Sequence, residues 1–183
     1  MTIQEHKYTV DDFDDFVLLP ENVDRLFEYI GGEIFEVPSN PFISKIGQRI
    51  AGEIYIYLKQ HDIGHLTGEA GGYIVSGERY APDVAFISYE KQADLAKSGY
   101  NPNPPDLAVE VVSSDSVAEN KKLTIKLSNY LAAGTVVWIV RPEDKYIEIH
   151  RPTKPVRTVH ENDTLNGGDV LPNLSIKLSD IFK

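Results

Sequence analysis

Two carboxylates set in apolar segments mark the part of this sequence best suited to chemistry. Asp83 opens the apolar run 83–88, and Glu110 interrupts the run 107–112. Runs of this length and β-branched content are typical of buried strands. A buried carboxylate is costly unless a cation or a hydrogen-bond donor offsets its charge. If the two strands are neighbours, we expect the two acids to converge on one divalent cation.

The expected cation is Mg²⁺, with Mn²⁺ as a substitute. Mg²⁺ takes oxygen ligands, commonly from one or two carboxylates, and retains several waters. The backbone carbonyl of Val111 is expected to complete the protein ligands beside Asp83 and Glu110. A bound cation would keep both carboxylates ionised and lower the pKa of an attacking water. This donor set predicts hydrolysis of a phosphodiester.

A lysine on the helix predicted over 117–133 is the candidate for positioning that water. The apolar stripe of this helix consists of Leu123, Leu127, Tyr130 and Leu131. At 3.6 residues per turn, Lys126 falls nearest the edge of the stripe, so its stem can pack on the core. Lys122 lies further round, and Lys121 lies on the opposite face. Lys126 is therefore the predicted catalytic lysine.

Structural interpretations of these residues stay open beside the catalytic ones. Glu110 and Lys126 could form a structural ion pair, Lys126 could instead be solvated, and Asp83 could end a turn after Pro82. Asp106, which follows two prolines, is better explained as a turn residue. The helix N-cap and first-turn acid are expected from Ser113, Ser114, Asp115 and Ser116.

Composition describes a globular chain of 183 residues, 42% hydrophobic and 25% charged. We expect a single domain over 1–183, with an N-terminal extension at 1–20 and C-terminal edge elements at 152–183. No apolar stretch reaches the roughly 18 to 20 residues of a membrane span, and no secretory signal is evident. We therefore expect a cytoplasmic protein. Absence of cysteine excludes disulfides and thiol catalysis.

The net charge of −10 opposes binding to nucleic acid, because phosphate backbones attract lysine and arginine. A local basic face and bound divalent cations would reduce that repulsion. The net charge therefore counts against DNA as the expected partner but does not exclude it.

The remaining pattern predicts an α/β or α+β fold with a mixed central sheet. A strand, a helix and a strand over 107–140 form a βαβ unit, whose two strands should be parallel. The other expected elements are a helix at 9–17, a β-hairpin at 25–37, a helix at 41–60, strands at 66–69, 73–76, 84–88 and 146–150, and a possible helical turn at 91–97.

Pro82-Asp83 on one strand, followed by Glu110-Val111-Val112 and a basic helix, resembles the PD-(D/E)XK nuclease superfamily. The segments "RLFEYIGGEIFEVPS", "PDVAFIS", "PPDLAVEVVSSDS" and "KLSNYLAAGTVVWIVRPEDKYIEIHRP" are more narrowly similar to the Uma-type, restriction-endonuclease-like family. The resemblance covers roughly residues 20 to 155. It implies a nuclease-like core with metal at Asp83 and Glu110 and with Lys126 as the active-site lysine.

Some positions depart from the family pattern. Val112 stands where the superfamily motif has its lysine, so the site depends on Lys126. Gly32 stands where the hairpin usually has an aspartate, and Ser44 replaces a histidine at the start of the long helix. The resemblance also implies an assisting acid from that helix, for which Glu53 is the candidate; a solvated position explains Glu53 better.

Three functions remain open from the sequence. The first is a Mg²⁺-dependent endonuclease that hydrolyses DNA. The second is a weakened or inactive nuclease fold that serves in binding or assembly, and the third is a metal-dependent phosphodiesterase for small substrates. Ile125 lies opposite the apolar stripe and is expected to be exposed. With the tyrosine-rich long helix and the family resemblance, it favours a homodimer.

Overall fold

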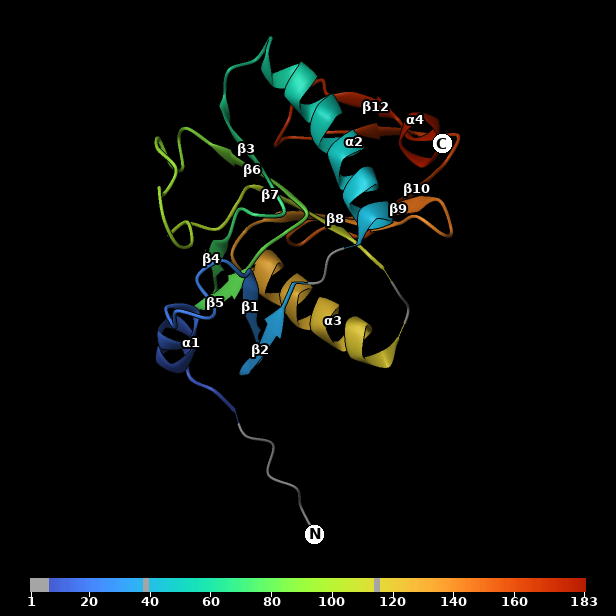
Figure 1. Ribbon diagram of the computed structural model, residues 1–183. Helices are drawn as coiled ribbons and strands as arrows, with labels where there is room; N and C mark the ends of the chain where they lie inside the picture. Colours follow the sequence, from blue (N-terminus) through green and yellow to red (C-terminus); the bar gives the residue numbers. More distant parts are fainter. Residues whose placement is uncertain (1–6, 38–39, 114–115) are drawn as a thin grey trace.

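The computed structural model describes residues 7–37, 40–113 and 116–183. Within them, a six-stranded mixed sheet with the order β10-β9-β8-β7-β6-β3 forms the centre of the molecule (Figure 1). Strands β7 and β8 are parallel, as predicted, and the other neighbours are antiparallel. The strands are β3 (Gly64–Gly68), β6 (Val84–Ser88), β7 (Leu107–Val111), β8 (Val136–Arg141), β9 (Tyr146–His150) and β10 (Arg157–His160).

A second, four-stranded sheet has the order β2-β1-β5-β4. Its strands are β1 (Phe27–Ile30), β2 (Glu33–Glu36), β4 (Tyr73–Val75) and β5 (Glu78–Tyr80). The β1–β2 pair confirms the predicted hairpin. Gly31 and Gly32 form its turn with φ values of 61° and 89°, which glycine adopts without steric cost. Strand β5 was not predicted, because two of its three residues are charged and give no apolar alternation.

The helices among the described residues are α1 (Val10–Val17), α2 (Pro41–Leu58), α3 (Val117–Ala132) and α4 (Leu178–Phe182). Thr9 and Asp12 form a capping box at the start of α1. Asn40 caps α2, and Ser116 caps α3 by accepting from the backbone N–H of Glu119. Ser114 and Asp115 lie outside the described residues. None of the described helices is long and apolar enough to cross a bilayer.

The two faces of the central sheet carry different chemistry. Val109 and Val111 of β7 belong to the apolar core under α2, whereas Ala108 contributes to the core on the α3 side. Because side chains alternate along a strand, Glu110 shares the α3 side with Ala108. Figure 1 shows α2 on one side of the sheet and α3 on the other. The predicted mixed sheet flanked by helices is confirmed, and it presents Glu110 to α3.

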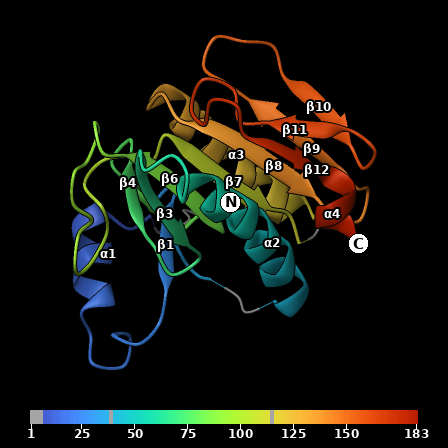
Figure 2. The same cartoon turned by 90° about the horizontal axis from the view of Figure 1, so that it is seen from above.

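The C-terminal residues cover the α2 side of the molecule. Strands β11 (Thr164–Asn166) and β12 (Ser175–Lys177) pair, and α4 follows directly (Figure 2). The buried apolar side chains that join this core are Leu165, Leu171, Leu174, Ile176, Leu178 and Ile181. Edge elements were predicted here, and β10 does lie at the sheet edge, but α4 was not predicted. A helix of five residues is too short to show an apolar periodicity.

The connector between β6 and β7 contains no helix, so the possible helical turn at 91–97 is wrong. Buried Asn101 organises this segment through its side chain. Its amide oxygen accepts from Gln92 Nε2 and from the backbone N–H of Ala96, each at 2.9 Å. Its amide nitrogen donates to the carbonyl of Gly72 at 3.2 Å. Hydrogen bonds to a side chain thus replace the local bonds that a helical turn would need.

Ile125 is partly buried, and the expectation of an exposed side chain is wrong. The β1–β2 hairpin covers this side of α3, and Ile125 packs against the apolar cluster that the hairpin shares with the sheet. An added Cβ at Gly31 would lie 3.0 Å from Cδ1 of Ile125, which shows how closely the turn approaches. Ile125 therefore gives no support to the predicted homodimer, which rests on its other arguments and remains a prediction.

Replacement of Ile125 by alanine should lower the free energy of unfolding by about 1 to 2 kcal/mol, since it removes a partly buried packing contact. Urea denaturation measures the loss. Ile56 is 57% exposed, and Ile56→Ala should change stability by less than about 0.5 kcal/mol. Equal effects of the two substitutions would contradict the packing of Ile125 under the hairpin.

Candidate active site

The register of two antiparallel strands brings Asp83 and Glu110 together. Val84 of β6 lies opposite Val109 of β7, and continuation of this register places Asp83 opposite Glu110. The Asp83 carboxylate accepts a hydrogen bond of 2.7 Å from the backbone N–H of Val111. Because the N–H and C=O of one strand residue point to the same side, the Val111 carbonyl also faces the Asp83 side. The expected neighbouring strands are confirmed.

Lys126 reaches Glu110 from α3. Its ammonium donates to Glu110 Oε2 at 2.7 Å, and the Tyr130 hydroxyl donates to Glu110 Oε1 at 3.0 Å. Lys126 is 6% exposed and Glu110 is 9% exposed. Positions 126 and 130 are one helical turn apart, so a single face of α3 supplies both donors. The structural ion pair considered from the sequence is present, and the catalytic use of these residues stays a prediction.

Glu28 is a third acid at this site, which the sequence analysis missed. Its Oε1 accepts from Lys126 Nζ at 2.8 Å and from the backbone N–H of Ala81 at 2.8 Å. Glu28 comes from β1, where its neighbours Phe27, Tyr29 and Ile30 are all buried. A carboxylate set among buried aromatic and aliphatic residues was the available signal, as it was for Glu110. Glu28 connects the hairpin to the central sheet through one lysine.

Burial and neighbouring charges set the protonation of the site. Burial raises the pKa of Asp83 to about 6, although the Val111 N–H and the charge of Lys126 oppose the shift. Burial likewise raises the pKa of Glu110, with Lys126 acting against it and Glu28 and Asp83 adding to it. Burial disfavours the Lys126 ammonium, but the charges of Glu110 and Glu28 outweigh that effect and raise its pKa. Lys126 is therefore a cation at neutral pH.

A second hydrogen-bond network supports the site from behind. Glu78 of β5 accepts from the Gly31 backbone N–H at 2.8 Å and from Asn129 Nδ2 at 3.1 Å, and it also bonds the Tyr80 hydroxyl. The Tyr80 ring meets the Tyr130 ring edge-on, with centroids 5.3 Å apart. These contacts hold α3, the hairpin and β5 in one arrangement. They restrict the position from which Tyr130 can donate to Glu110.

The site opens into a cavity of about 390 Å³. The acids Glu28, Asp83 and Glu110 lie on its lining together with Val111 and Lys126. Residues of β2, of the start of α2 and of the first two turns of α3 form the other walls of the cavity. The other lining residues are Ile30, Phe35, Glu36, Val37, Asn40, Ile43, Ala81, Val112, Ser113, Ser116, Glu119, Lys122 and Leu123. A ligand in this cavity would contact both apolar walls and the buried acids.

The donor set can be compared with the requirements of Mg²⁺. In the described part of the chain, no group of three His, Cys, Asp or Glu side chains is arranged as a metal site. Mg²⁺ needs less, since one or two carboxylates with retained waters suffice. Asp83, Glu110 and the Val111 carbonyl supply such a set beside a cavity with space for water. The residues present fit the expected cation.

Other candidates lie away from the cavity or serve the fold. Asp106 accepts from the Ser88 backbone N–H at 2.7 Å and pairs with Lys91 at 3.2 Å, so the structural interpretation of Asp106 is confirmed. The residues that line the cavity do not include Glu53, Gly32 or Ser44. Val112, the position at which the resemblance expects the superfamily lysine, and Lys122 both line the cavity.

Replacement of Lys126 by methionine should destabilise the fold by about 3 kcal/mol, because Glu28 and Glu110 would lose their buried counter-charge. Urea denaturation of the two proteins measures this. Lys121 is 65% exposed at its side chain, so Lys121→Met should change the free energy of unfolding by less than about 0.5 kcal/mol. Similar midpoints for both variants would show that the ion-pair network contributes little to stability.

The raised pKa of Asp83 predicts a pH-dependent stability. The folded protein binds this proton more tightly than the unfolded chain, whose ordinary pKa is 3.8. The stability contributed by Asp83 is therefore full below about pH 3.8 and is lost as the pH rises through about 6. Thermal midpoints measured across this range should fall in the wild type relative to Asp83→Asn, which retains an oxygen for the Val111 N–H. If the thermal midpoints of the wild type and of Asp83→Asn changed in parallel with pH, the raised pKa of Asp83 would be contradicted.

Among solved structures, the crystal structure of "a putative nuclease belonging to DUF820 from Anabaena variabilis ATCC 29413" has a TM-score of 0.80 at 20% identity, covering 95% of this chain and 97% of that chain. This likeness concerns the fold. A comparison with curated proteins gives no match. Residues 13–179 match the model of the Uma2 family, described as "Putative restriction endonuclease", which confirms the expected resemblance. The chain belongs to the Uma2 family.

Proposed function

We propose that this protein is a metal-dependent nuclease that hydrolyses DNA phosphodiester bonds. The observation that carries the proposal is the arrangement around Glu110: a buried carboxylate held by Lys126 and Tyr130, opposite Asp83, on the wall of a cavity. A purely structural ion pair has no need of a second acid or of an opening to solvent. Family membership supports the same activity.

Each residue has a distinct part in the proposed reaction. Asp83, Glu110 and the Val111 carbonyl would hold Mg²⁺ or Mn²⁺, which supplies charge neutralisation at the phosphate and a more acidic water. Lys126 has three ammonium donors, of which Glu28 and Glu110 accept two. In the proposed reaction the third would orient the attacking water or stabilise the charge that develops on the phosphate. Glu28 is a positioning residue, because it orients this ammonium and favours its charge.

Three observations favour one or other of the two alternatives. The net charge of −10 and the position of Val112 favour a nuclease fold retained for binding or assembly. The small cavity favours a phosphodiesterase for small substrates. The first alternative needs no metal binding at Asp83, and the second requires cleavage of model phosphodiesters without cleavage of polymeric DNA. Measurements of metal binding and of cleavage on the same samples therefore separate both alternatives from the proposal.

Calorimetric titration with Mn²⁺ and Mg²⁺, paired with a DNA-cleavage assay on the same samples, tests the proposal. Glu110→Gln and Asp83→Asn should each weaken metal binding by about tenfold or more and remove cleavage, because each removes a ligand charge. Glu53→Gln is the matched control, since Glu53 does not line the cavity. Thermal midpoints confirm that each variant is folded.

The wild-type result decides among the three functions. Metal binding and cleavage that both disappear in the two variants would support the nuclease. A folded wild-type protein that binds neither cation and cuts no DNA would overturn it in favour of a binding module. Metal binding with hydrolysis of model phosphodiesters alone would establish the small-substrate enzyme.

A further inference from the structure

The two lysines that line the cavity are held in different ways. Lys126 is 6% exposed and is engaged by two acids at the cavity floor. Lys122 lies one helical turn earlier on α3, and its side chain is 25% exposed. Its partner is Glu119, at 2.6 Å and 45% exposed. An ion pair this close to solvent is weak, so an incoming anion can replace Glu119 as the partner of Lys122.

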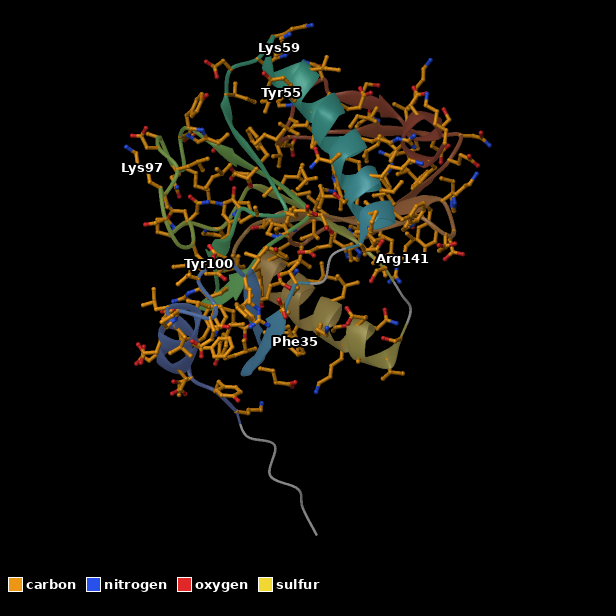
Figure 3. The ribbon with its side chains drawn as sticks, in the orientation of Figure 1. Phe35, Tyr55, Lys59, Lys97, Tyr100 and Arg141 are labelled. Carbon is orange, nitrogen blue, oxygen red and sulfur yellow. The ribbon has the colours of Figure 1, made fainter. Side chains whose placement is uncertain are left out.

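Phe35 holds the Lys122 ammonium at the cavity wall. The Nζ atom lies 4.3 Å from the centroid of the Phe35 ring, within the range of a cation–π contact. Phe35 comes from β2, and Figure 3 shows it between the hairpin and α3. Both residues line the cavity. The ring thus keeps the charge of Lys122 beside the buried acids and adds an apolar surface next to it.

The charges around the cavity are unsuited to a long duplex. Its described lining contains five acids, namely Glu28, Glu36, Asp83, Glu110 and Glu119. Among the described lining residues, the cations are Lys122 and Lys126 alone, and two of the three ammonium donors of Lys126 are taken by Glu28 and Glu110. Binding to duplex DNA relies on many simultaneous phosphate contacts. Lys122 is thus the described lining cation that is not already bound by two acids, which suits contact with a single phosphate.

The size of the cavity limits the substrate in the same direction. About 390 Å³ lies near the lower end of the range for small-molecule sites. Of the acids proposed to act on the phosphate, Glu110 is buried and Asp83 is half-buried, and both line this space. A nucleotide must leave the stack to enter a pocket of this size, and this costs least when it is unpaired. An unpaired strand can bend its backbone into the cavity, whereas a stacked duplex cannot without losing pairs.

We infer that the cavity takes one nucleotide unit of an unpaired strand, with Lys122 binding its phosphate and Phe35 contacting its apolar part. This inference rests on the proposed nuclease activity and names its substrate class. It assigns Lys122 a role in substrate binding that is separate from the role of Lys126. The same chemistry would be presented by a single-stranded oligonucleotide and by a free dinucleotide.

Fluorescence anisotropy tests the inference without requiring cleavage. The probes are a labelled oligothymidylate and a blunt duplex of the same length, with Ca²⁺ in place of Mg²⁺ to prevent hydrolysis. The wild type should bind the single strand about tenfold more tightly than the duplex. Lys122→Met should weaken single-strand binding by about tenfold through loss of a charge-assisted contact, and Lys122→Arg should restore most of it.

Lys121→Met is the matched control for charge. It removes the same charge one residue away, from a side chain that is 65% exposed and outside the cavity lining. Its effect on single-strand binding should stay within about twofold. Competition with unlabelled thymidine dinucleotide distinguishes the two sources. Full displacement is expected for a site that takes one unit, whereas weak displacement would show contacts along the strand and overturn the one-unit site.

The result can contradict this inference independently of the proposed function. Duplex binding as tight as single-strand binding, absence of single-strand binding, or equal losses in Lys121→Met and Lys122→Met would each overturn the assignment of Lys122. Metal binding that depends on Asp83 and Glu110 would stand in all these cases. Conversely, the single strand could bind in a Lys122-dependent way while the protein binds no metal. This result would support the binding site at Lys122 and overturn the proposed nuclease function.

Discussion

The buried charge of Glu110 is the constraint on which the arrangement of this molecule depends. This carboxylate lies in the central sheet, 9% exposed, where burial favours its neutral form. Lys126 supplies the compensating charge, and Tyr130 supplies a further donor. Burial of the Glu110 carboxylate or of the Lys126 ammonium without the other would cost free energy, because a buried charge would be left unpaired. The position of α3 over the sheet is therefore determined by polar contacts as well as by apolar packing.

Lys126 extends this constraint to the N-terminal part of the chain. Through Glu28 it binds β1, and Glu28 in turn accepts from the backbone N–H of Ala81, just before Asp83. One ammonium therefore joins the hairpin, α3 and the two central strands. Side chains from four segments far apart in the sequence meet at one point. The cavity forms where these segments converge, and its acids are held in place before any ligand enters.

The two faces of the sheet divide stability and chemistry between them. The α2 side is apolar and includes side chains from the C-terminal residues, such as Leu165 and Ile176. The α3 side mixes apolar packing with the network of Glu28, Glu110 and Lys126. Such a division allows the polar side to tolerate buried charge, because the continuous core on the other side contributes the hydrophobic stabilisation.

Local patterns in the sequence were enough to predict most elements and two of the three acids of the site. Alternating or continuous apolar runs predicted the hairpin, the strands around Asp83 and Glu110, and both long helices, because these patterns are local. Helical periodicity selected Lys126, since a lysine beside an apolar stripe must pack its stem on the core. Short elements such as β5 and α4 escaped prediction because they contain too few residues to show a period.

The residues that share the site from distant parts of the chain could be identified only from the folded arrangement. Glu28 joins it because β1 lies beside the linker before β6, and no spacing along the chain encodes that contact. Ile125 is partly buried for the same reason: the hairpin covers a face of α3 that helical periodicity alone assigns to solvent. The chemistry of single side chains can be read from their local pattern, whereas their partners depend on how the chain folds back on itself.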